Sequence, residues 1–382
     1  MEAGVRDAIF NDLFVLEMAS NHWGSLERGL KIVQDYGRVV CANGVHAAMK
    51  LQFRDVDSFI HRDFRDRLDI RYVKKTLDTH MPWESYRWLT EAVRAQNMIV
   101  MATPFDERSV EKCVEYGVEI IKIASSDIKD WPLIGKIAAT RKPVIISTGG
   151  ASLEEIDTIA AYFNSREIPL AINHCVSLYP SEDADLELNQ IDFLINRYPD
   201  NEIGFSSHEY HDWRSSITTA YAKGARTFER HVDIDYENVP VSAYCSLPHQ
   251  VDAWFKAFCK TKEMCGGSSK VKRMPPQREI DYLDGLVRGV YARRDLPAGH
   301  VIGHGDVYLA IPLQHGQLSC RELAYGEVLR APVTAEGLIR FDNVACALSG
   351  DEALREMIAT RGLPVETPRP QQHLRVADGR RG

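Results

Sequence analysis

Short apolar runs alternate with longer amphipathic stretches from residue 13 to about residue 263. Apolar runs rich in β-branched residues predict strands, and apolar positions at helical spacing predict helices between them. The predicted strands are Leu13–Ala19, Ala47–Phe53, Met98–Pro104, Glu119–Ser125, Pro143–Gly149, Leu170–Val176, Glu202–His208 and Thr227–Asp233. The predicted helices include Ser109–Tyr116, Leu153–Phe163, Trp213–Lys223 and Gln250–Glu263.

This alternation predicts an α/β fold in which eight strand–helix units close into a parallel (β/α)8 TIM barrel. Near-continuous apolar strands such as residues 143–147 are typical of a sheet that is covered on both faces. A doubly wound open sheet is the alternative. We favour the barrel because of the eight units and because no Gly-x-Gly-x-x-Gly motif follows the first strand.

The predicted barrel domain spans residues 1–263, and the rest of the chain has a different character. Residues 264–284 contain Gly-Gly-Ser-Ser and Pro-Pro and predict a linker. A small β-rich module is expected at 285–349, followed by a partly disordered tail at 350–382. Within the barrel, the long polar segment 54–82 follows the second strand, where we expect an active-site loop.

Composition and charge narrow the range of partners. The 382 residues carry a formal net charge of −8, which gives no general attraction to nucleic acid or to an anionic membrane surface. No apolar run approaches the roughly 20 residues of a membrane helix, and the first residues do not resemble a secretion signal. The eight cysteines include no Cys-x-x-Cys pair. We therefore predict a cytoplasmic protein with no nucleic-acid or membrane partner.

Catalytic side chains of such barrels lie at the C-terminal ends of the strands. The seventh, eighth and first strands are neighbours in a closed barrel and end near His208, His231 and Glu17. Two imidazoles beside a carboxylate suit a catalytic divalent metal. The residues alone leave open that both histidines are ordinary polar or core residues.

Lys50 and Lys122 each interrupt an apolar strand. An inward lysine is costly inside a barrel unless it is paired or hydrated. With Ser125, Ser147 and Ser206 nearby, the two lysines predict a phosphate or carboxylate site. Two alternatives stay open, namely ion pairs with acidic residues inside the barrel and a Schiff-base lysine in a metal-independent aldolase.

A set of short motifs, in this order along the chain, resembles the sialic acid synthase family, including its spore-coat polysaccharide synthase branch. The motifs are Glu17–Gly24, Lys50–Gln52, Thr103–Asp106, Lys122–Ser125, Ser147–Gly149, His174–Pro180, Gly204–His208 and Glu229–His231. The segment 285–349 resembles the antifreeze-like (SAF) module that follows the barrel in this family.

The resemblance implies a fold, an assembly and a reaction. The barrel of one subunit would be capped by the SAF module of another in a domain-swapped homodimer. Phosphoenolpyruvate would condense with the aldehyde of an N-acetylmannosamine-like hexosamine. The products would be a nonulosonic, sialic-acid-like acid and phosphate, released by cleavage of the C–O bond.

The resemblance also implies roles for individual residues. The metal, Mn²⁺ or Mg²⁺, would be held by His208 and His231. The catalytic side chains would be Glu17, Lys122 and Tyr179. The substrate-binding side chains would be Lys50, Gln52, Thr103, Ser125, Asp127, Ser147, Ser177 and Ser206.

Departures from the family pattern gather on the side expected to face the sugar. Ser177 replaces the usual Asn, Asp127 replaces Glu, and Glu209 replaces Thr. The stretch Ile311–Gln314 has no arginine where the family's module usually carries one. The pattern predicts retained carbon–carbon chemistry with an altered acceptor. Two other functions stay open, a carbohydrate-binding scaffold without catalysis and a Schiff-base pyruvate aldolase acting through Lys122.

Overall fold

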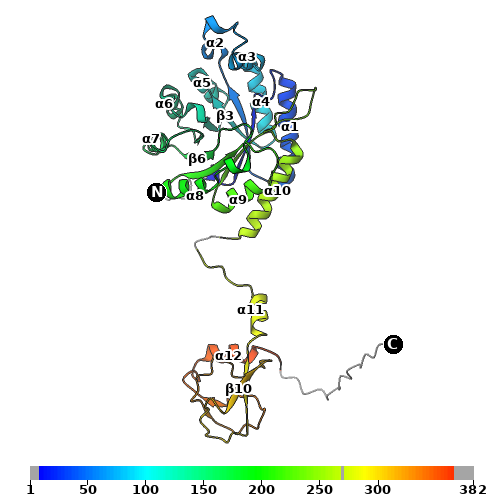
Figure 1. The fold of residues 1–382 in the computed structure, drawn as a ribbon, viewed down its shortest axis with the longest axis vertical. Helices are drawn as coiled ribbons and strands as arrows, with labels where there is room; N and C mark the ends of the chain where they lie inside the picture. The colour runs from blue at the N-terminus through cyan, green and yellow to red at the C-terminus, as the bar shows by residue number, and fades with distance from the viewer. Residues whose placement is uncertain (1–7, 268–270, 365–382) are drawn as a thin grey trace, which may run out of the picture. The chain divides into compact units, whose positions relative to one another are not determined.

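The computed structural model describes residues 8–267 and 271–364. The chain divides into two compact units, Met1–Gly266 and Gly267–Gly382, each of which is described by itself (Figure 1). Among the described helices, none is long and apolar enough to cross a membrane. All eight cysteines are free thiols.

The first unit is a closed barrel of eight parallel strands in the order β1 to β8, which confirms the predicted TIM barrel and excludes the open sheet. Each strand lies within two residues of its predicted bounds. The strands are β1 Leu13–Ala19, β2 Ala47–Phe53, β3 Ile99–Pro104, β4 Ile120–Ile123, β5 Val144–Ser147, β6 Leu170–Cys175, β7 Glu202–Ser207 and β8 Thr227–His231.

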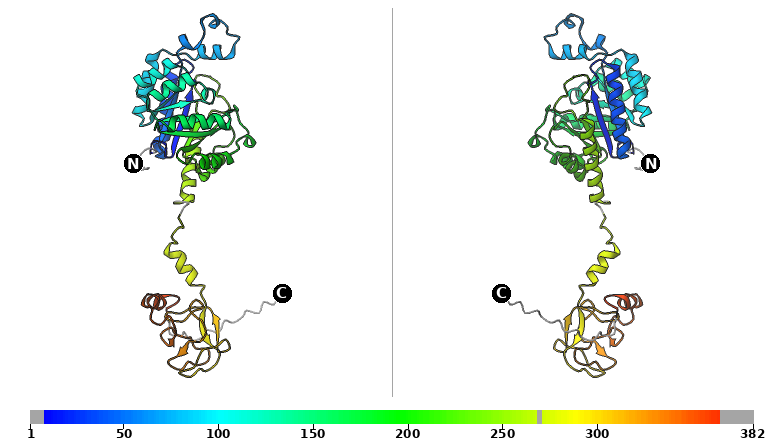
Figure 2. Two further views of the ribbon diagram at one scale, coloured as in Figure 1. Left: turned by 90° about the vertical axis from the view of Figure 1, so that its left-hand side faces the viewer. Right: turned by 90° about the vertical axis from the view of Figure 1, so that its right-hand side faces the viewer.

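Helices surround this barrel and connect its strands (Figures 1 and 2). They are α1 Leu26–Asn43, α2 Val56–Phe59, α3 Arg71–Asp78, α4 Trp83–Ala95, α5 Glu107–Glu115, α6 Trp131–Ala139, α7 Leu153–Asn164, α8 Asn189–Arg197, α9 Ser215–Lys223 and α10 Pro248–Cys265. The segment between β2 and α4, which carries α2 and α3, projects from one end of the barrel unit in Figure 2, where it is coloured blue to light blue.

Local signals in the sequence explain where several helices begin and end. The Ser25 side chain accepts a hydrogen bond from the Arg28 backbone N–H at the start of α1, and Gly44 ends that helix in a left-handed conformation. Ser152 and Glu155 form a reciprocal capping box at the start of α7.

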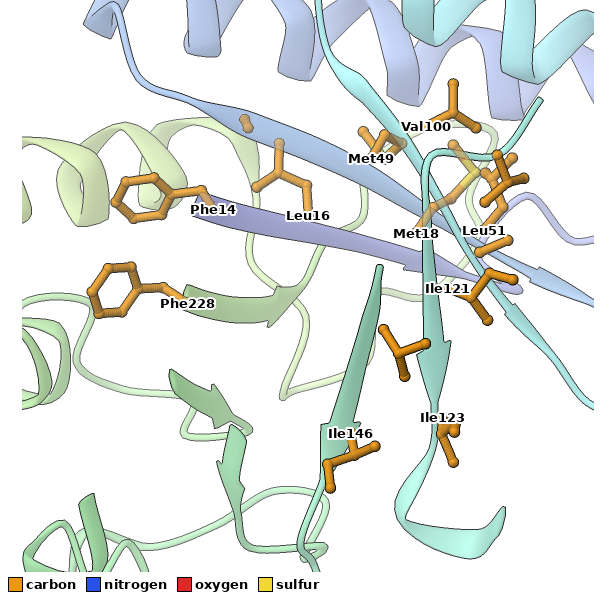
Figure 3. Packing of buried hydrophobic residues seen from close by; sticks show 14 of the residues in the cluster. Phe14, Leu16, Met18, Met49, Leu51, Val100, Ile121, Ile123, Ile146 and Phe228 are labelled. Atoms are coloured by element: carbon orange, nitrogen blue, oxygen red, sulfur yellow. The ribbon is translucent and has the colours of Figure 1, made fainter. Parts of the chain in front are cut away.

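The two-residue period of the strands separates the main core from the barrel interior. Phe14, Leu16 and Met18 point from β1 into the layer between strands and helices, together with Met49 and Leu51 of β2 (Figure 3). A second, smaller cluster fills the barrel floor from the opposite strand faces. It includes Leu13, Val15, Ala48, Met101, Ile120, Ile145 and Ala171. The residues two positions after Val15, Ala48, Met101, Ile120 and Ile145 are polar, and they help to build the site.

The second unit has a core of its own that contains Val290, Leu318, Ile339 and Phe341. Its described elements are α11 Gln277–Asp284, β9 Gly289–Ala292, β10 Val307–Ala310, β11 Val328–Leu329, β12 Val344–Ala345 and α12 Glu352–Thr360. The strands form two small antiparallel pairs, β9 with β10 and β11 with β12.

The predicted linker and tail contain structure. Helix α11 lies inside the stretch 264–284, and α12 lies inside the stretch 350–382. Ile358 of α12 is buried in the core of the second unit. Residues 365–382, on which much of the predicted disorder falls, lie outside the described residues, as do residues 268–270 of the linker. The domain bounds therefore stay predictions.

Candidate active site

A cavity of about 640 Å³ lies at the C-terminal ends of the barrel strands. Every predicted site residue lines it. These are Glu17, Lys50, Gln52, Thr103, Lys122, Ser125, Asp127, Ser147, Ser177, Tyr179, Ser206, His208 and His231. Residues from every strand or from the loop that follows it therefore converge on one cavity, as in a TIM-barrel active site.

Glu229 of β8 joins the two inward lysines. Its carboxylate accepts hydrogen bonds from Lys50 Nζ at 2.7 Å and from Lys122 Nζ at 2.8 Å. Ser206 Oγ donates to the same carboxylate at 3.2 Å. Lys50 Nζ also lies 3.1 Å from Glu17 Oε2. The ion-pair interpretation of the lysines is thus correct for this structure, although both lysines also line the cavity.

Burial and pairing set the protonation of this charge cluster. Burial raises the pKa of Glu17, and the nearby Glu229 carboxylate adds to the rise. Burial would also raise the pKa of Glu229, but Lys122 and Lys50 hold it well below its ordinary value. The two carboxylates raise the pKa of Lys50 against the effect of burial, whereas burial lowers the pKa of Lys122. One carboxylate thus stays ionised between two ammonium groups, and Glu17 is the easier one to protonate.

Glu17 is held in place from its other side by a chain of amide and guanidinium contacts. Gln52 Nε2 donates to Glu17 Oε1 at 2.8 Å, and one Arg54 N–H donates to Gln52 Oε1 at 3.0 Å. These contacts follow the inward face of β2, from Lys50 outward to the segment after the strand. Lys50, Gln52 and Arg54 all line the cavity.

The two predicted metal ligands face each other at the ends of β7 and β8. The ring centroids of His208 and His231 lie 5.4 Å apart. His208 Nδ1 lies 2.9 Å from the Val176 carbonyl oxygen, so the ring donates there and its Nε2 keeps a lone pair. Burial lowers the pKa of His208 to about 4 and the pKa of His231 well below its usual range. Both imidazoles are therefore neutral, the form that binds a metal.

The donor set fits a metal only in part. His231 Nδ1 is buried without a hydrogen-bond partner in the described structure, which is typical of an atom that awaits a ligand. Across residues 8–267 and 271–364, however, no group of three or more His, Cys, Asp and Glu side chains is arranged to hold a metal. Two imidazoles are present, and further ligands would have to come from substrate, water or a moved Glu17.

Aromatic rings pack around the histidine pair. The Tyr179 ring centroid lies 4.0 Å from that of His208 and 5.2 Å from that of Tyr244. Tyr244, in the segment between β8 and α10, lies 5.2 Å from His231 by the same measure. About half of the Tyr179 surface is exposed, so this ring forms part of the cavity wall.

Hydroxyl groups line the side of the cavity opposite the histidines in the strand order. Ser125 Oγ accepts from the Gly149 backbone N–H at 3.1 Å. A Cβ at Gly149 would meet Ser177 Oγ at 2.1 Å and Ser125 Oγ at 2.8 Å, so any larger residue here would displace both hydroxyl groups. Thr103 Oγ1 is buried without a partner among the described residues and is free to bind a ligand.

Three charged residues of the cavity were not predicted from the sequence. Glu229 was part of a motif but had no role, although two buried lysines require a buried counter-ion. Arg54 and Lys75 come from the segment 54–82, whose place in the site was predicted without naming residues. Their charge alone gave no signal, because this segment is rich in arginine and aspartate throughout.

Comparison with known proteins decides the family. The model of the NeuB family matches residues 39–270, well over half of the chain. The chain belongs to the NeuB family. The model of the SAF domain matches residues 287–345, within the module predicted at 285–349. The resemblance to sialic acid synthases and to their antifreeze-like module is thereby confirmed.

Relatives with curated names are synthases of sialic-acid-like sugars by their names. The chain is 30% identical over 283 residues to N-acetylneuraminate-9-phosphate synthase of Drosophila melanogaster, which covers 71% of this chain and 72% of that protein. It is 28% identical over 235 residues to N,N'-diacetyllegionaminic acid synthase of Legionella pneumophila. This match covers 60% of this chain and 64% of that protein.

Solved structures agree. A spore coat polysaccharide biosynthesis protein E from Chromobacterium violaceum has a TM-score of 0.82 and 34% identity, and covers 87% of this chain and 99% of that chain. An N-acetylneuraminic acid synthetase from Leptospira borgpetersenii, in complex with citrate, has a TM-score of 0.62 and 26% identity. The match covers 72% of this chain and 91% of that chain.

Proposed function

We propose that this chain joins phosphoenolpyruvate to the open-chain aldehyde of a hexosamine, giving a nonulosonic acid and inorganic phosphate. The observation that carries the proposal is the meeting of Glu17, Lys50, Lys122, His208 and His231 in one cavity at the C-terminal end of the barrel. The names of the sialic acid, legionaminic acid and pseudaminic acid synthases among its relatives support it.

The phosphate and carboxylate of phosphoenolpyruvate would bind at the two lysines. Lys50 and Lys122 now share the Glu229 carboxylate, which keeps both ammonium groups aimed into the cavity. A bound phosphate would offer the two ammonium groups oxygen acceptors with more negative charge than the Glu229 carboxylate alone. The hydroxyl groups of Thr103, Ser125, Ser147 and Ser206 line the same cavity and would donate to the phosphate or carboxylate. Glu229 acts here as a positioning residue.

A divalent cation, Mn²⁺ or Mg²⁺, held by His208 and His231 would polarise the sugar aldehyde and stabilise the alkoxide that develops on it. The neutral state of both rings and the partnerless Nδ1 of His231 fit this role. Tyr179, which packs on His208, would close the sugar side of the cavity together with Gln52, Asp127 and Ser177.

The proposed reaction forms one carbon–carbon bond and breaks one C–O bond. The methylene carbon of phosphoenolpyruvate forms a bond to the aldehyde carbon, and the aldehyde oxygen takes a proton to become a hydroxyl. Water adds to the central carbon and gives up a proton. The bond between that carbon and the bridging oxygen then breaks while the new hydroxyl on the carbon loses its proton to the leaving phosphate, which releases hydrogen phosphate and leaves a 2-keto acid. Glu17, buried and with a raised pKa, suits the proton transfer from water. The ammonium groups of Lys50 and Lys122 would stabilise the leaving phosphate.

The first test measures phosphate release from phosphoenolpyruvate with Mn²⁺ and a panel of aldoses, with and without chelator. The panel contains N-acetylmannosamine, its 6-phosphate and diacetamido-trideoxyhexoses. We expect release that needs a sugar, stops with chelator and is lost in His208→Asn. The matched control is His211→Asn, since His211 is partly exposed and lies outside the cavity. Release without any sugar, or release that persists in His208→Asn, would contradict the assigned roles.

A label distinguishes the two ways of breaking phosphoenolpyruvate. With ¹⁸O in the bridging oxygen, C–O cleavage carries the label into the released phosphate. P–O cleavage would leave it on the carbon product. We expect labelled phosphate.

One observation favours a second candidate. Burial lowers the pKa of Lys122, as in lysines that form Schiff bases with carbonyl substrates. Borohydride reduction in the presence of pyruvate would then attach the substrate covalently to Lys122, independently of metal. The 2.8 Å ion pair with Glu229 argues against a free amine. Binding of a sugar with no turnover under any condition would instead support a carbohydrate-binding scaffold.

Two further expectations rest on the family resemblance and belong to this proposal. We infer a homodimer in which one subunit's SAF module caps the partner's barrel, and a cytoplasmic location. The stretch Ile311–Gln314 carries no arginine for such a cap. Sedimentation of the purified protein tests the dimer.

A further inference from the structure

Arg54 is a cation at the cavity without an acidic partner. Its guanidinium carbon lies 3.7 Å from the ring centroid of Phe105, and one N–H donates to Gln52 at 3.0 Å. Within the part of the chain that the structure describes, no carboxylate lies within ion-pairing distance of Arg54. Burial lowers the pKa of this guanidinium more than Asp127, Glu17 and Asp106 raise it from beyond ion-pairing distance, so its charge is held at a cost that a bound anion would offset.

The depth of Arg54 in the cavity indicates which ligand it would meet. Lys50, Gln52 and Arg54 follow one another at every second position, along the inward face of β2 and past its end. A strand advances about 3.3 Å per residue, so the Cα of Arg54 lies roughly 13 Å further along than the Cα of Lys50, and the Arg54 guanidinium contacts the Gln52 side chain between them. Phosphoenolpyruvate at Lys50 and Lys122 therefore leaves a sugar between itself and Arg54, with the aldehyde directed inward.

Lys75 of α3 adds a second cation at the same end of the cavity. It lines the cavity with Tyr72, Thr76 and Thr79 of the same segment. Its ammonium forms no ion pair among the described residues, unlike its neighbour Lys74, which pairs with Asp78 at 2.6 Å. Burial lowers the pKa of Lys75, and the nearby Arg54 and Arg71 lower it further. Two unpaired like charges at one wall favour an anion between them.

We propose that the acceptor sugar is anionic, and that Arg54 with Lys75 binds a phosphate or carboxylate group at the end of the sugar remote from the aldehyde. This inference rests on the proposed function and names the class of its acceptor. Arg54 offers the planar pair of donors that fits an oxyanion, and Phe105 holds that plane in place.

The test compares three acceptors that differ only at carbon six, namely N-acetylmannosamine, its 6-phosphate and N-acetylmannosaminuronic acid. The wild-type protein should use one of the two anionic sugars best, and the comparison tells phosphate from carboxylate. In Arg54→Met, kcat/KM for that sugar should fall about tenfold or more, since a charge-assisted contact is lost. The ratio of kcat/KM for that sugar to kcat/KM for neutral N-acetylmannosamine should also fall about tenfold, because the contact of Arg54 with Gln52, and through it with Glu17, serves both sugars alike. The KM for phosphoenolpyruvate should change less than about threefold.

Two matched controls come from the same segment. Arg67→Met removes an exposed arginine that pairs with Asp69, and Lys74→Met removes the paired neighbour of Lys75. Both should behave as the wild type, whereas Lys75→Met should follow Arg54→Met in the same direction.

Each other outcome overturns the inference in a recognisable way. A preference for the neutral sugar refutes an anionic acceptor while leaving the synthase intact. An equal rise in the KM for phosphoenolpyruvate in Arg54→Met would assign Arg54 to that substrate instead. If no sugar is turned over, the proposed function fails, and calorimetric binding of the three sugars decides the inference alone. Binding that does not distinguish the anionic sugars, or that Arg54→Met leaves unchanged, would then refute it.

Discussion

Glu229 determines whether the two inward lysines of the barrel can be tolerated. It is about 5% exposed and accepts from both ammonium groups, so its removal would leave Lys50 with Glu17 alone and Lys122 without a carboxylate partner. Replacing one partner of a buried ion pair costs about 3–5 kcal/mol. We expect Glu229→Gln to lower the free energy of unfolding by about this amount, measured in urea.

Two companion variants separate the loss of the buried ion pairs from the effect of any Glu→Gln substitution. The double variant Glu229→Gln/Lys122→Met should recover part of the loss, because it removes one of the unpaired charges. Glu84→Gln on α4, whose side chain is largely exposed, should change stability by less than about 0.5 kcal/mol. A Glu229→Gln variant as stable as the wild type would show that the lysines are hydrated.

His22 gives the protein a dependence of stability on pH that is separate from the active site. The ring is buried, accepts from the Gly24 backbone N–H at 3.1 Å and does not line the cavity. Burial lowers its pKa from 6.5 to about 4 in the folded chain. The unfolded chain therefore binds a proton first as pH falls, and stability is lost between pH 6.5 and about pH 4.

His22→Asn keeps an acceptor for Gly24 and removes the titrating ring. The wild type should lose about 2 kcal/mol more than this variant between pH 7 and pH 4.5, measured by urea unfolding at both values. His46→Asn serves as the control because His46 is exposed. Parallel pH profiles for wild type and His22→Asn would contradict the assignment.

The role of Glu229 could not be predicted because its partners lie far away along the chain. Glu229 lies 107 and 179 positions from the lysines it pairs with. A motif shows which residues are present, but pairing across a barrel depends on strand register and side-chain reach. His208, His231 and Glu17 were easier to bring together, since neighbouring strands in a closed barrel place their ends side by side.

At the scale of elements, the strands were predictable and the segment 54–82 was not. Buried strands such as Val144–Ser147 carry a strong apolar signal, which fixed all eight within two residues. Helix α3, Arg-Tyr-Val-Lys-Lys-Thr-Leu-Asp, buries only Thr76 and lacks an apolar face of the usual width. Its helical form therefore could not be read from periodicity.

Replacing two glycines by alanine should change the stability of the protein in opposite directions, because their surroundings differ. A Cβ at Gly204 of β7 would lie 1.9 Å from Thr227 Oγ1 and 2.6 Å from the Thr227 carbonyl oxygen of the paired strand β8. A Cβ at Gly135 inside α6 would meet only Tyr162 Oη at 3.9 Å. We expect Gly204→Ala to destabilise the protein by about 1–3 kcal/mol and Gly135→Ala to stabilise it by about 0.5–1 kcal/mol.

Thermal unfolding of the two alanine variants measures both effects. Each serves as the other's control, since the chemical change is identical and only the surroundings differ. A neutral Gly204→Ala would mean that β7 and β8 can move apart without cost, against the close approach of their backbones at this position.

At the scale of the whole molecule, the two units have separate hydrophobic cores. In the second unit, the segment after α12 is tied down by Arg361. Its guanidinium donates to both carboxylate oxygens of Glu322, at 2.9 and 2.8 Å, and to Ser319 Oγ at 3.0 Å. The pair is buried, so the stability of this unit depends on residues close to the C-terminal end of the described chain.

Arg361→Met should therefore destabilise the second unit alone, by about 3–5 kcal/mol, since it leaves a buried Glu322 without its partner. The chain offers a selective probe, because all six tryptophans (23, 83, 88, 131, 213 and 254) lie in the barrel unit. We expect the midpoint of thermal unfolding by tryptophan fluorescence to stay unchanged, while calorimetry shows a transition at lower temperature. Arg355→Met, which alters an exposed arginine of α12, is the matched control. A lowered fluorescence midpoint in Arg361→Met would show that the second unit stabilises the barrel, and that the two cores unfold as one.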